Sequence, residues 1–216
     1  YATGSTTGVV VDSGEGTTHV AVVYDGYSTQ HSVDEVDVAG KSITQYLHRS
    51  ISVSDVLGKS VLDMVTAAHI KEKLCYVAGD YNKELKAYSR DRKTHEEYEL
   101  PDGKKLNIGE LAVKATEGMF NPSILGSPSI GLHEAINSII LKSDLDYRRE
   151  LCENILLAGG NTMFKGFAER LNSELNELMS TNMKISVAAA ADRKFSVWIG
   201  GSILTTLSSF QSSWVT

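Results

Sequence analysis

The chain has 216 residues, 42% of them hydrophobic and 22% charged, a globular composition that can bury a sizeable core in one large domain or two smaller ones. A formal net charge of −6 argues against a broadly basic nucleic-acid surface, and no apolar run approaches the ~18–20 residues that span a bilayer. Cys75 and Cys152 lack metal-ligand spacing, so we expect reduced, buried thiols in a cytosolic protein.

Residues 8–26 predict an antiparallel hairpin with a glycine-rich tip, because β-branched residues dominate 8–11 and 19–24 and the link between them is short. Gly14 and Gly16 allow backbone N–H groups to converge on an anionic oxygen. Asp12 and Glu15 would repel a bare phosphate, a conflict that a hydrated divalent cation resolves. His19 could orient an attacking water, although an ordinary turn-forming hairpin explains this stretch about equally well.

The next hundred residues predict a mainly helical region. Apolar spacing indicates a helix from near Gly40 and a helix or pair of helices over 54–77, capped by Ser52 or Ser54. Residues 80–99 have few large aliphatic side chains and mixed charge, which favours a solvated surface segment.

A second hairpin and a loop close this region. Residues 100–103 form a strong turn signal, 106–108 can be the returning strand, and 109–120 have a helical pattern. Residues 121–129 hold two of the three prolines and form a loop. Its apolar pair, Ile124 and Leu125, is either tucked into the core or offered to a partner.

From Gly131 onward helices and strands alternate. The pattern predicts helices over 132–141, 146–153 and 163–179, strands over 154–158 and 183–187, and a final helix-like run over 196–210. The first and last thirds of the chain therefore predict an α/β architecture, with a mainly helical insertion between them.

A second glycine turn, Gly159-Gly160-Asn161-Thr162, is expected to follow a buried strand and open a helix. That geometry suits a phosphate or a nucleoside at a helix N-terminus, although a tight turn without a ligand is the commoner explanation of such a motif. On local sequence alone Lys71, Glu72 and Lys194 are solvated surface charges and His19 is a hydrogen-bonded strand residue. Lys194 could also reach a ligand near the last helix.

Several segments in the same order resemble the carboxyl-terminal half of actin and the actin-related proteins. They are residues 12–19, similar to the second phosphate loop, and 70–78, 98–103, 122–126, 159–163 and 193–204. The resemblance implies an α/β, actin-type ATPase (ribonuclease H-like) fold. Residues 1–38 and 131–195 would form one α/β lobe, 39–130 its inserted subdomain, and 196–216 a final helical segment that packs with the first lobe. That lobe is missing here and Tyr1 is not an initiator methionine, so we expect a fragment or processed piece.

The ligand that the resemblance implies is ATP or ADP with Mg²⁺ or Ca²⁺. By position, Asp12 would hold the metal through water and take part in catalysis, and His19 would help to place the hydrolytic water. The other nucleotide-binding residues would be Gly14, Glu15, Gly16, Lys71, Glu72, Gly159, Gly160, Asn161, Met163, Phe164 and Lys194.

The implied function is that of a filament-forming or filament-associated protein of the cytoplasmic cytoskeleton, with slow ATP hydrolysis when complete. Its partners would be the missing amino-terminal lobe, other actin-family subunits and actin-binding proteins. We expect weak or no ATPase activity from this chain alone. The loop over 121–130 resembles the plug that helps filament strands to pack, which favours a partner surface for Ile124 and Leu125.

Departures from the family pattern support an alternative. Glu15 stands in place of an aspartate and Ala68 in place of an arginine, as expected of a divergent actin-related scaffold subunit that binds nucleotide without hydrolysing it. A third possibility is a sugar kinase or heat-shock chaperone of the same superfamily. The segments 71–76 and 196–202 disfavour it, because those proteins are not expected to share them.

Overall fold

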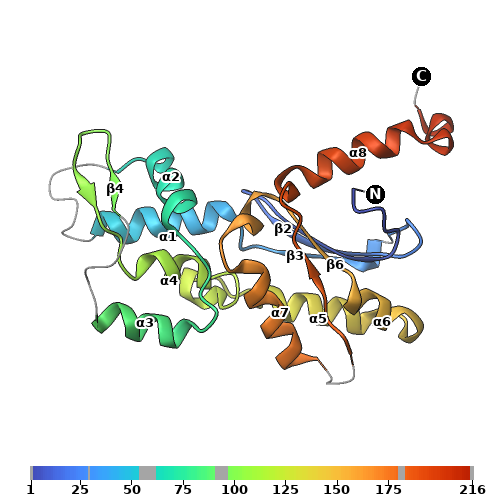
Figure 1. Ribbon diagram of the computed structural model, residues 1–216, viewed down its shortest axis with the longest axis horizontal. Helices are drawn as coiled ribbons and strands as arrows, with labels where there is room; N and C mark the ends of the chain where they lie inside the picture. The colour runs from blue at the N-terminus through green and yellow to red at the C-terminus, as the bar shows by residue number, and fades with distance from the viewer. Residues whose placement is uncertain (1, 29, 54–61, 91–96, 180–182, 215–216) are drawn as a thin grey trace.

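The computed structural model describes residues 2–28, 30–53, 62–90, 97–179 and 183–214, and shows two parts side by side (Figure 1). One part is an α/β lobe built from both ends of the chain. The other is a mainly helical part inserted between β3 and α5. The predicted α/β class is therefore confirmed. In the described ranges, no helix combines the length and the apolar character needed to cross a membrane.

The lobe is organised around a five-stranded sheet in the order β3-β2-β1-β6-β7. The strands are β1 (Gly8–Ser13), β2 (Thr18–Val23), β3 (Val33–Val36), β6 (Ile155–Ala158) and β7 (Val187–Ala188). β1 pairs with β2 as the predicted antiparallel hairpin and with β6 in parallel, and β7 extends β6 in parallel. The carboxyl ends of β1, β6 and β7 consequently meet at one edge of the sheet.

Three helices cover one face of this sheet (Figure 1). They are α5 (Leu132–Lys142), which contacts β2 and β3, α6 (Leu145–Glu153), which contacts β1, and α7 (Phe167–Leu178), which contacts β7. Alternate strand residues such as Val9, Val11 and Val20 point into this layer and are fully buried. Burying each such side chain contributes roughly 1.5–3 kcal/mol to folding. The other face lies below α8 (Ser196–Thr206), a helix with no buried residue among those described.

The hydrophobic core of the lobe continues into the inserted part. Its elements are α1 (Gly40–Val53), α2 (Met64–Leu74), α3 (Tyr81–Arg90), α4 (Leu111–Glu117) and the hairpin of β4 (Tyr98–Glu99) and β5 (Lys105–Leu106). α1 packs against α2 and α4, and its apolar stripe of Ile43, Leu47 and Ile51 is buried. The predicted helix from Gly40 and the second hairpin are confirmed.

Of the two predicted caps for the next helix, Ser52 was wrong and Ser54 is not tested. Ser52 lies inside α1, and Ser54 falls outside the described residues. Asp63 caps α2 instead, since its carboxylate accepts a 2.6 Å hydrogen bond from the backbone N–H of Thr66. α2 also ends before the expected Val77, because the extended segment after it bonds elsewhere: Val77 N–H donates to Lys165 O at 2.9 Å.

The prediction of a solvated surface segment over 80–99 agrees with α3, where nine of the ten residues are exposed or half-buried, and 91–96 fall outside the described residues. α3 buries one side chain, Tyr88, whose hydroxyl is 3.2 Å from that of Tyr76. Tyr76 in turn donates to Glu84 Oε1 at 2.5 Å. A tyrosine network with few aliphatic residues thus attaches this helix.

Several predicted elements are shorter than expected. α4 covers only the middle of 109–120, β7 only the end of 183–187, and α8 stops at Thr206 before a 3₁₀ segment, η6 (Ser208–Ser213). The glycine turn at Gly159 opens into a 3₁₀ turn, η4 (Gly160–Met163), because α7 begins only after Gly166 in left-handed conformation (φ 81°).

The apolar pair of the 121–129 loop lies in a 3₁₀ turn, η3 (Pro122–Leu125), and both side chains are half-buried. Leu125 packs against the core, and a Cβ at Gly118 would lie 2.3 Å from Leu125 Cγ. The resemblance had favoured a partner surface for Leu125. In the structure the Leu125 side chain instead packs against the core, over Gly118 at the end of α4.

Candidate functional site

The first hairpin and the second glycine turn come together at the carboxyl edge of the sheet. Asp12 is paired with His19 across the antiparallel ladder and with Ala158 across the parallel one. Residues directly opposite share a face, so Asp12 and His19 lie on the face away from the buried valines. His19 is exposed, and its Nδ1 lies 3.5 Å from Thr17 Oγ1.

The hairpin tip, residues 14–17, offers unused backbone donors. Gly14 N–H bonds to Thr17 O at 3.3 Å and closes the turn. Within the described ranges, the N–H groups of Glu15, Gly16 and Thr17 have no hydrogen-bond partner. A Cβ at Gly14 or Gly16 would meet no atom within 4 Å, so the tip is open to a ligand. Such a run of free N–H groups is a binding surface for an anion.

The first turn of α1 holds this tip from behind. Gly40 N–H donates to Gly14 O at 3.0 Å, and Lys41 N–H donates to Glu15 O at 2.8 Å. A Cβ at position 40 would lie 2.4 Å from Glu15 Oε2 and 3.2 Å from the backbone oxygen of Gly14, so a side chain there would displace the Glu15 carboxylate and crowd the tip. Glycine at this helix start therefore permits the close approach.

Lys71 on α2 reaches the same tip. Its Nζ donates to Glu15 Oε2 and to Gly40 O, each at 3.1 Å, and the residue is only 4% exposed. Reading Lys71 as a solvated charge was therefore wrong, since a buried ammonium needs such partners. The Glu15 side chain is 64% exposed, so solvent screens the ion pair and keeps its worth at roughly 1 kcal/mol or less. Glu72 is exposed, as its local sequence predicted.

The second glycine turn packs directly on the end of β1. Gly159 has φ 88°, and a Cβ there would lie 2.3 Å from Ser13 O. Asn161 donates from Nδ2 to Ser13 Oγ at 3.0 Å, and Ser13 Oγ is 2.7 Å from Thr18 Oγ1. Thr18 donates on to Val38 O at 2.7 Å. This buried hydroxyl chain joins the two turns, and Asn161 Oδ1 at its end is buried without a hydrogen-bond partner.

Arg193 holds the second glycine turn in place, a role that was not predicted from the sequence. It lies in the 3₁₀ turn η5 (Arg193–Phe195), and its guanidinium donates to Thr162 Oγ1 at 3.2 Å and to Thr162 O at 3.0 Å. Its own carbonyl accepts from Gly159 N–H at 3.1 Å. The basic pair Arg193-Lys194 was the available signal, but Thr162, the partner, is 31 residues away.

The remaining predicted nucleotide-binding residues differ in how exposed they are. Lys194 is exposed and its stem lies beside Gly160, where a Cβ would be 3.9 Å from Lys194 Cε. Met163 is 40% exposed, whereas Phe164 is half-buried and packs against the core. Over the described part of the chain, no group of three His, Cys, Asp or Glu side chains is placed to hold a metal ion.

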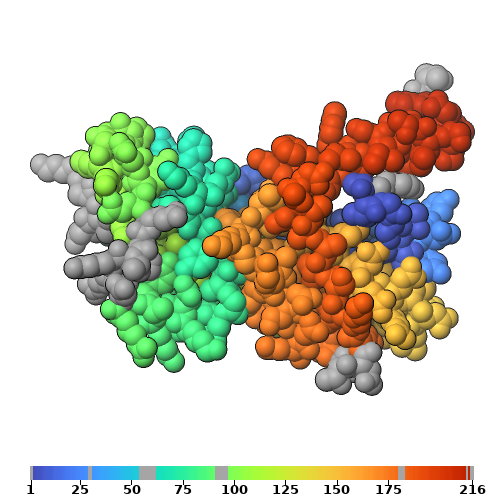
Figure 2. Space-filling view, viewed as in Figure 1, coloured from blue at the N-terminus to red at the C-terminus, as the bar shows by residue number. Residues whose placement is uncertain are grey.

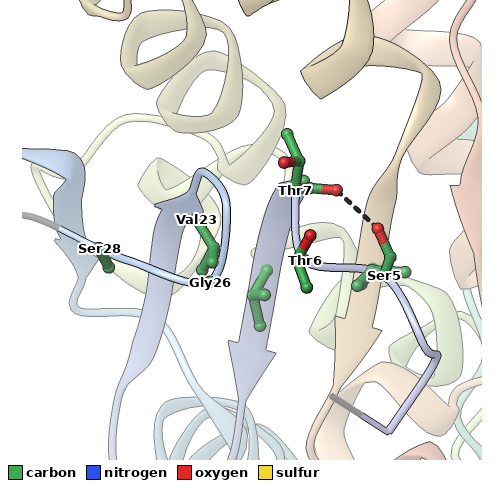
Figure 3. A pocket seen from close by; sticks show the side chains of 9 residues that line it. Ser5, Thr6, Thr7, Val23, Gly26 and Ser28 are labelled. Atoms are coloured by element: carbon green, nitrogen blue, oxygen red, sulfur yellow. Dashed lines mark hydrogen bonds between the residues drawn. The ribbon is translucent and has the colours of Figure 1, made fainter.

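Two hollows lie on the face of the sheet opposite α5, α6 and α7, away from the tip. One, of about 200 Å³, lies between α8 and the sheet and is lined by Val10, Leu156, Ala188 and Val197 among others. Figure 2 shows α8 rising above the lobe over it. The other, of about 170 Å³, is drawn in Figure 3, where Ser5 bonds to Thr7 O at 2.9 Å at its rim. None of the predicted nucleotide residues lines either hollow.

Comparison with known proteins found one matching family model and a similar curated protein. The family model described as Actin matches residues 1–62 and 58–216. An "Actin-like protein" of Neurospora crassa is 42% identical over 218 residues. That alignment covers 100% of this chain and 57% of the relative, so the chain spans little more than half the relative's length.

Proposed function

Because this chain belongs to the actin family, we propose that it supplies one side of a cleft that binds ATP or ADP with Mg²⁺ or Ca²⁺. The observation that carries this proposal is the set of unused N–H groups on Glu15, Gly16 and Thr17 at the tip. They lie at the carboxyl ends of parallel strands, where α/β folds bind ligands.

The residues at the tip fit a phosphate with its cation. The free N–H groups would donate to β- or γ-phosphate oxygens, and Asp12 would hold the cation through water, as Mg²⁺ prefers few carboxylates and several waters. The bound cation would offset the repulsion between phosphate and the carboxylates at the tip. His19, beside the Thr17 hydroxyl, would position a water for attack.

The adenosine end would lie between the tip and the second glycine turn. Lys71, Glu72, Gly159, Gly160, Asn161, Met163, Phe164 and Lys194 are proposed there from the resemblance. Asn161 supports a ligand at this place, because a buried acceptor such as its Oδ1, without a donor, costs about 1–3 kcal/mol of stability. A ligand hydroxyl or a bound water that donates to Asn161 Oδ1 would remove that cost.

The exposed apolar side chains of α8 support a partner on this face of the lobe. α8 exposes Val197, Trp198 and Ile203, at 60%, 78% and 38%, above an apolar hollow. Exposed large apolar side chains gathered on one helix are typical of an interface. We propose that the remaining length of an actin-family protein, the missing amino-terminal lobe, packs here. The complete protein would join cytoplasmic cytoskeletal filaments with other actin-family subunits and with actin-binding proteins, and would hydrolyse ATP slowly.

A second candidate function rests on the ion pair at the tip. Lys71 engages the Glu15 carboxylate, at the position where the family pattern has a shorter aspartate. An ~1 Å displacement of a group in such a site can cost ~100-fold in rate. A scaffold subunit that binds nucleotide without turning it over is therefore the alternative.

The test uses the full-length protein and its Asp12→Asn variant. We expect equilibrium dialysis to show Mg-dependent ATP binding, weakened in Asp12→Asn and unchanged in Asp146→Asn, a surface control on α6. Single-turnover hydrolysis separates the two candidates, since a scaffold would bind ATP and release it intact. Failure both to bind ATP and to co-sediment with filaments would refute the proposal.

A further inference from the structure

Three sulfur atoms meet on the lobe, remote from the proposed nucleotide edge. Cys152 Sγ at the end of α6 lies 3.7 Å from Met179 Sδ and 3.6 Å from Met183 Sδ. Met179 is the residue that ends α7, and Met183 lies on the approach to β7. One thiol thus lies in contact with two thioethers.

The backbone fixes this arrangement. Ser186 N–H donates to Cys152 O at 3.0 Å, which ties the end of α6 to the segment carrying Met183. Met179 N–H donates to Leu175 O at 2.9 Å, within the final turn of α7. Cys152 is fully buried and Met179 is 9% exposed, whereas Met183 is half-buried and borders the solvent. The cluster is therefore preformed, with one ligand at its entrance.

The spacing suits a three-coordinate soft metal. Thiolate and thioether sulfurs select Cu(I) among biological metals, and a metal about 2.3 Å from three sulfurs in one plane would set them about 4.0 Å apart. The two distances from Cys152 Sγ, 3.7 and 3.6 Å, are each within a few tenths of an ångström of that value. Methionine side chains accommodate such differences readily.

Charge favours a monovalent ion over a divalent one. One thiolate with Cu⁺ or Ag⁺ is neutral, so it can occupy an apolar interior at little cost. Zn²⁺ with the same three ligands would leave a net positive charge in the interior, where Cys152 and Met179 are buried. The site therefore discriminates by charge as well as by softness.

We propose that Cys152, Met179 and Met183 form a binding site for a soft monovalent metal ion, Cu⁺ or Ag⁺. Binding forms one metal–thiolate bond and two metal–thioether bonds and releases the thiol proton to solvent. No electron is transferred, because the ion arrives already monovalent. The site is independent of nucleotide binding.

The second buried thiol supplies a matched control. Burial raises the pKa of Cys75 to about 12, and burial, with the nearby Glu153 carboxylate, also raises that of Cys152, so neither thiol is reactive by itself. Within the described ranges, no methionine sulfur contacts Cys75. A difference in metal binding between the two thiols would therefore come from the thioethers.

The experiment measures the transfer of Cu⁺ from its bathocuproine disulfonate complex to the purified protein under nitrogen, with direct Ag⁺ titration as a second probe. We expect one ion bound per chain. Cys152→Ser should abolish binding and Cys75→Ser should leave it unchanged. Met183→Leu should weaken binding by at least the ~10–100-fold that loss of an outer-shell partner costs.

The methionine variant keeps the test decisive even if Cys152→Ser folds poorly, because Met→Leu nearly conserves core volume. Affinity should also rise about tenfold per pH unit near neutrality, as one proton is released. Equal binding by Met183→Leu and the parent protein, or loss of binding in Cys75→Ser, would overturn the proposal.

Discussion

The buried ion pair between Arg170 and Glu117 joins the two parts of the molecule, and Glu117→Ala should reveal its worth. Arg170 on α7 donates to both Glu117 oxygens on α4, at 2.9 and 3.0 Å, and the two side chains are 9% and 7% exposed. Arg170 also donates to Ala78 O at 2.9 Å and to Glu174 Oε1 at 2.6 Å. Removing Glu117 would leave a buried guanidinium with its remaining partners only.

The expected loss follows from the two bonds. Hydrogen bonds to charged groups contribute about 1.5–3 kcal/mol each, and breaking a buried pair typically costs 3–5 kcal/mol. Because Glu174 still balances part of the charge, we expect the lower end, a loss of about 3 kcal/mol. Urea unfolding followed by circular dichroism would report it as a lower midpoint at unchanged m-value.

A matched control lies one helical turn earlier. Lys114 pairs with Glu110 on the same helix, but the Glu110 side chain is 47% exposed. Lys114→Ala should therefore cost no more than about 0.5 kcal/mol. If Glu117→Ala were as mild as Lys114→Ala, the pair would not hold the two parts together and this reasoning would be refuted.

Two further changes test burial and backbone geometry. Burial lowers the pKa of His133 below its usual 6.5 against the opposing pull of Glu174, so the unfolded chain protonates first and stability should fall as pH drops below about 6.5. His133→Gln should flatten that part of the stability profile measured by urea unfolding, whereas the exposed His31→Gln should not. Gly159→Ala should cost more than the ~1 kcal/mol typical of a strained left-handed position, since its Cβ would strike Ser13 O. Gly79→Ala, with open space around it, should have little effect on the melting temperature, and equal melting of the two variants would contradict the placement of Gly159.

Sequence periodicity was enough for the elements that bury continuous apolar stripes. The first hairpin, α1, α5, α6 and β6 were predicted because their aliphatic residues repeat at the strand or helix period. α3 was not predicted because a single tyrosine is its only buried side chain. The helix predicted over 163–179 begins later than expected, because the left-handed residue that precedes α7 is Gly166.

Long-range partners set the limit for the site. The glycine turns and the acidic tip were visible as motifs, but burial of Lys71 depends on Glu15, 56 residues away in the sequence. The role of Arg193 depends on Thr162, and the sulfur cluster joins Cys152 to methionines 27 and 31 residues away. Spacing rules for metal ligands also pass over methionine, so Cys152 gave no signal. None of these pairs has a local pattern to reveal it.

The attachment of the hairpin tip to α1 has a consequence for how the tip meets an anion. The carbonyls of Gly14 and Glu15, which accept bonds from the first two N–H groups of α1, belong to the same peptide groups as the N–H donors of Glu15 and Gly16. In a trans peptide the C=O and N–H bonds point in opposite directions, so pinning the oxygens toward α1 aims both N–H bonds away from it. The positive end of the helix also polarises these two peptides and strengthens them as donors. α1 thereby presets the orientation of two peptide planes before any ligand arrives, which reduces the ordering cost of binding.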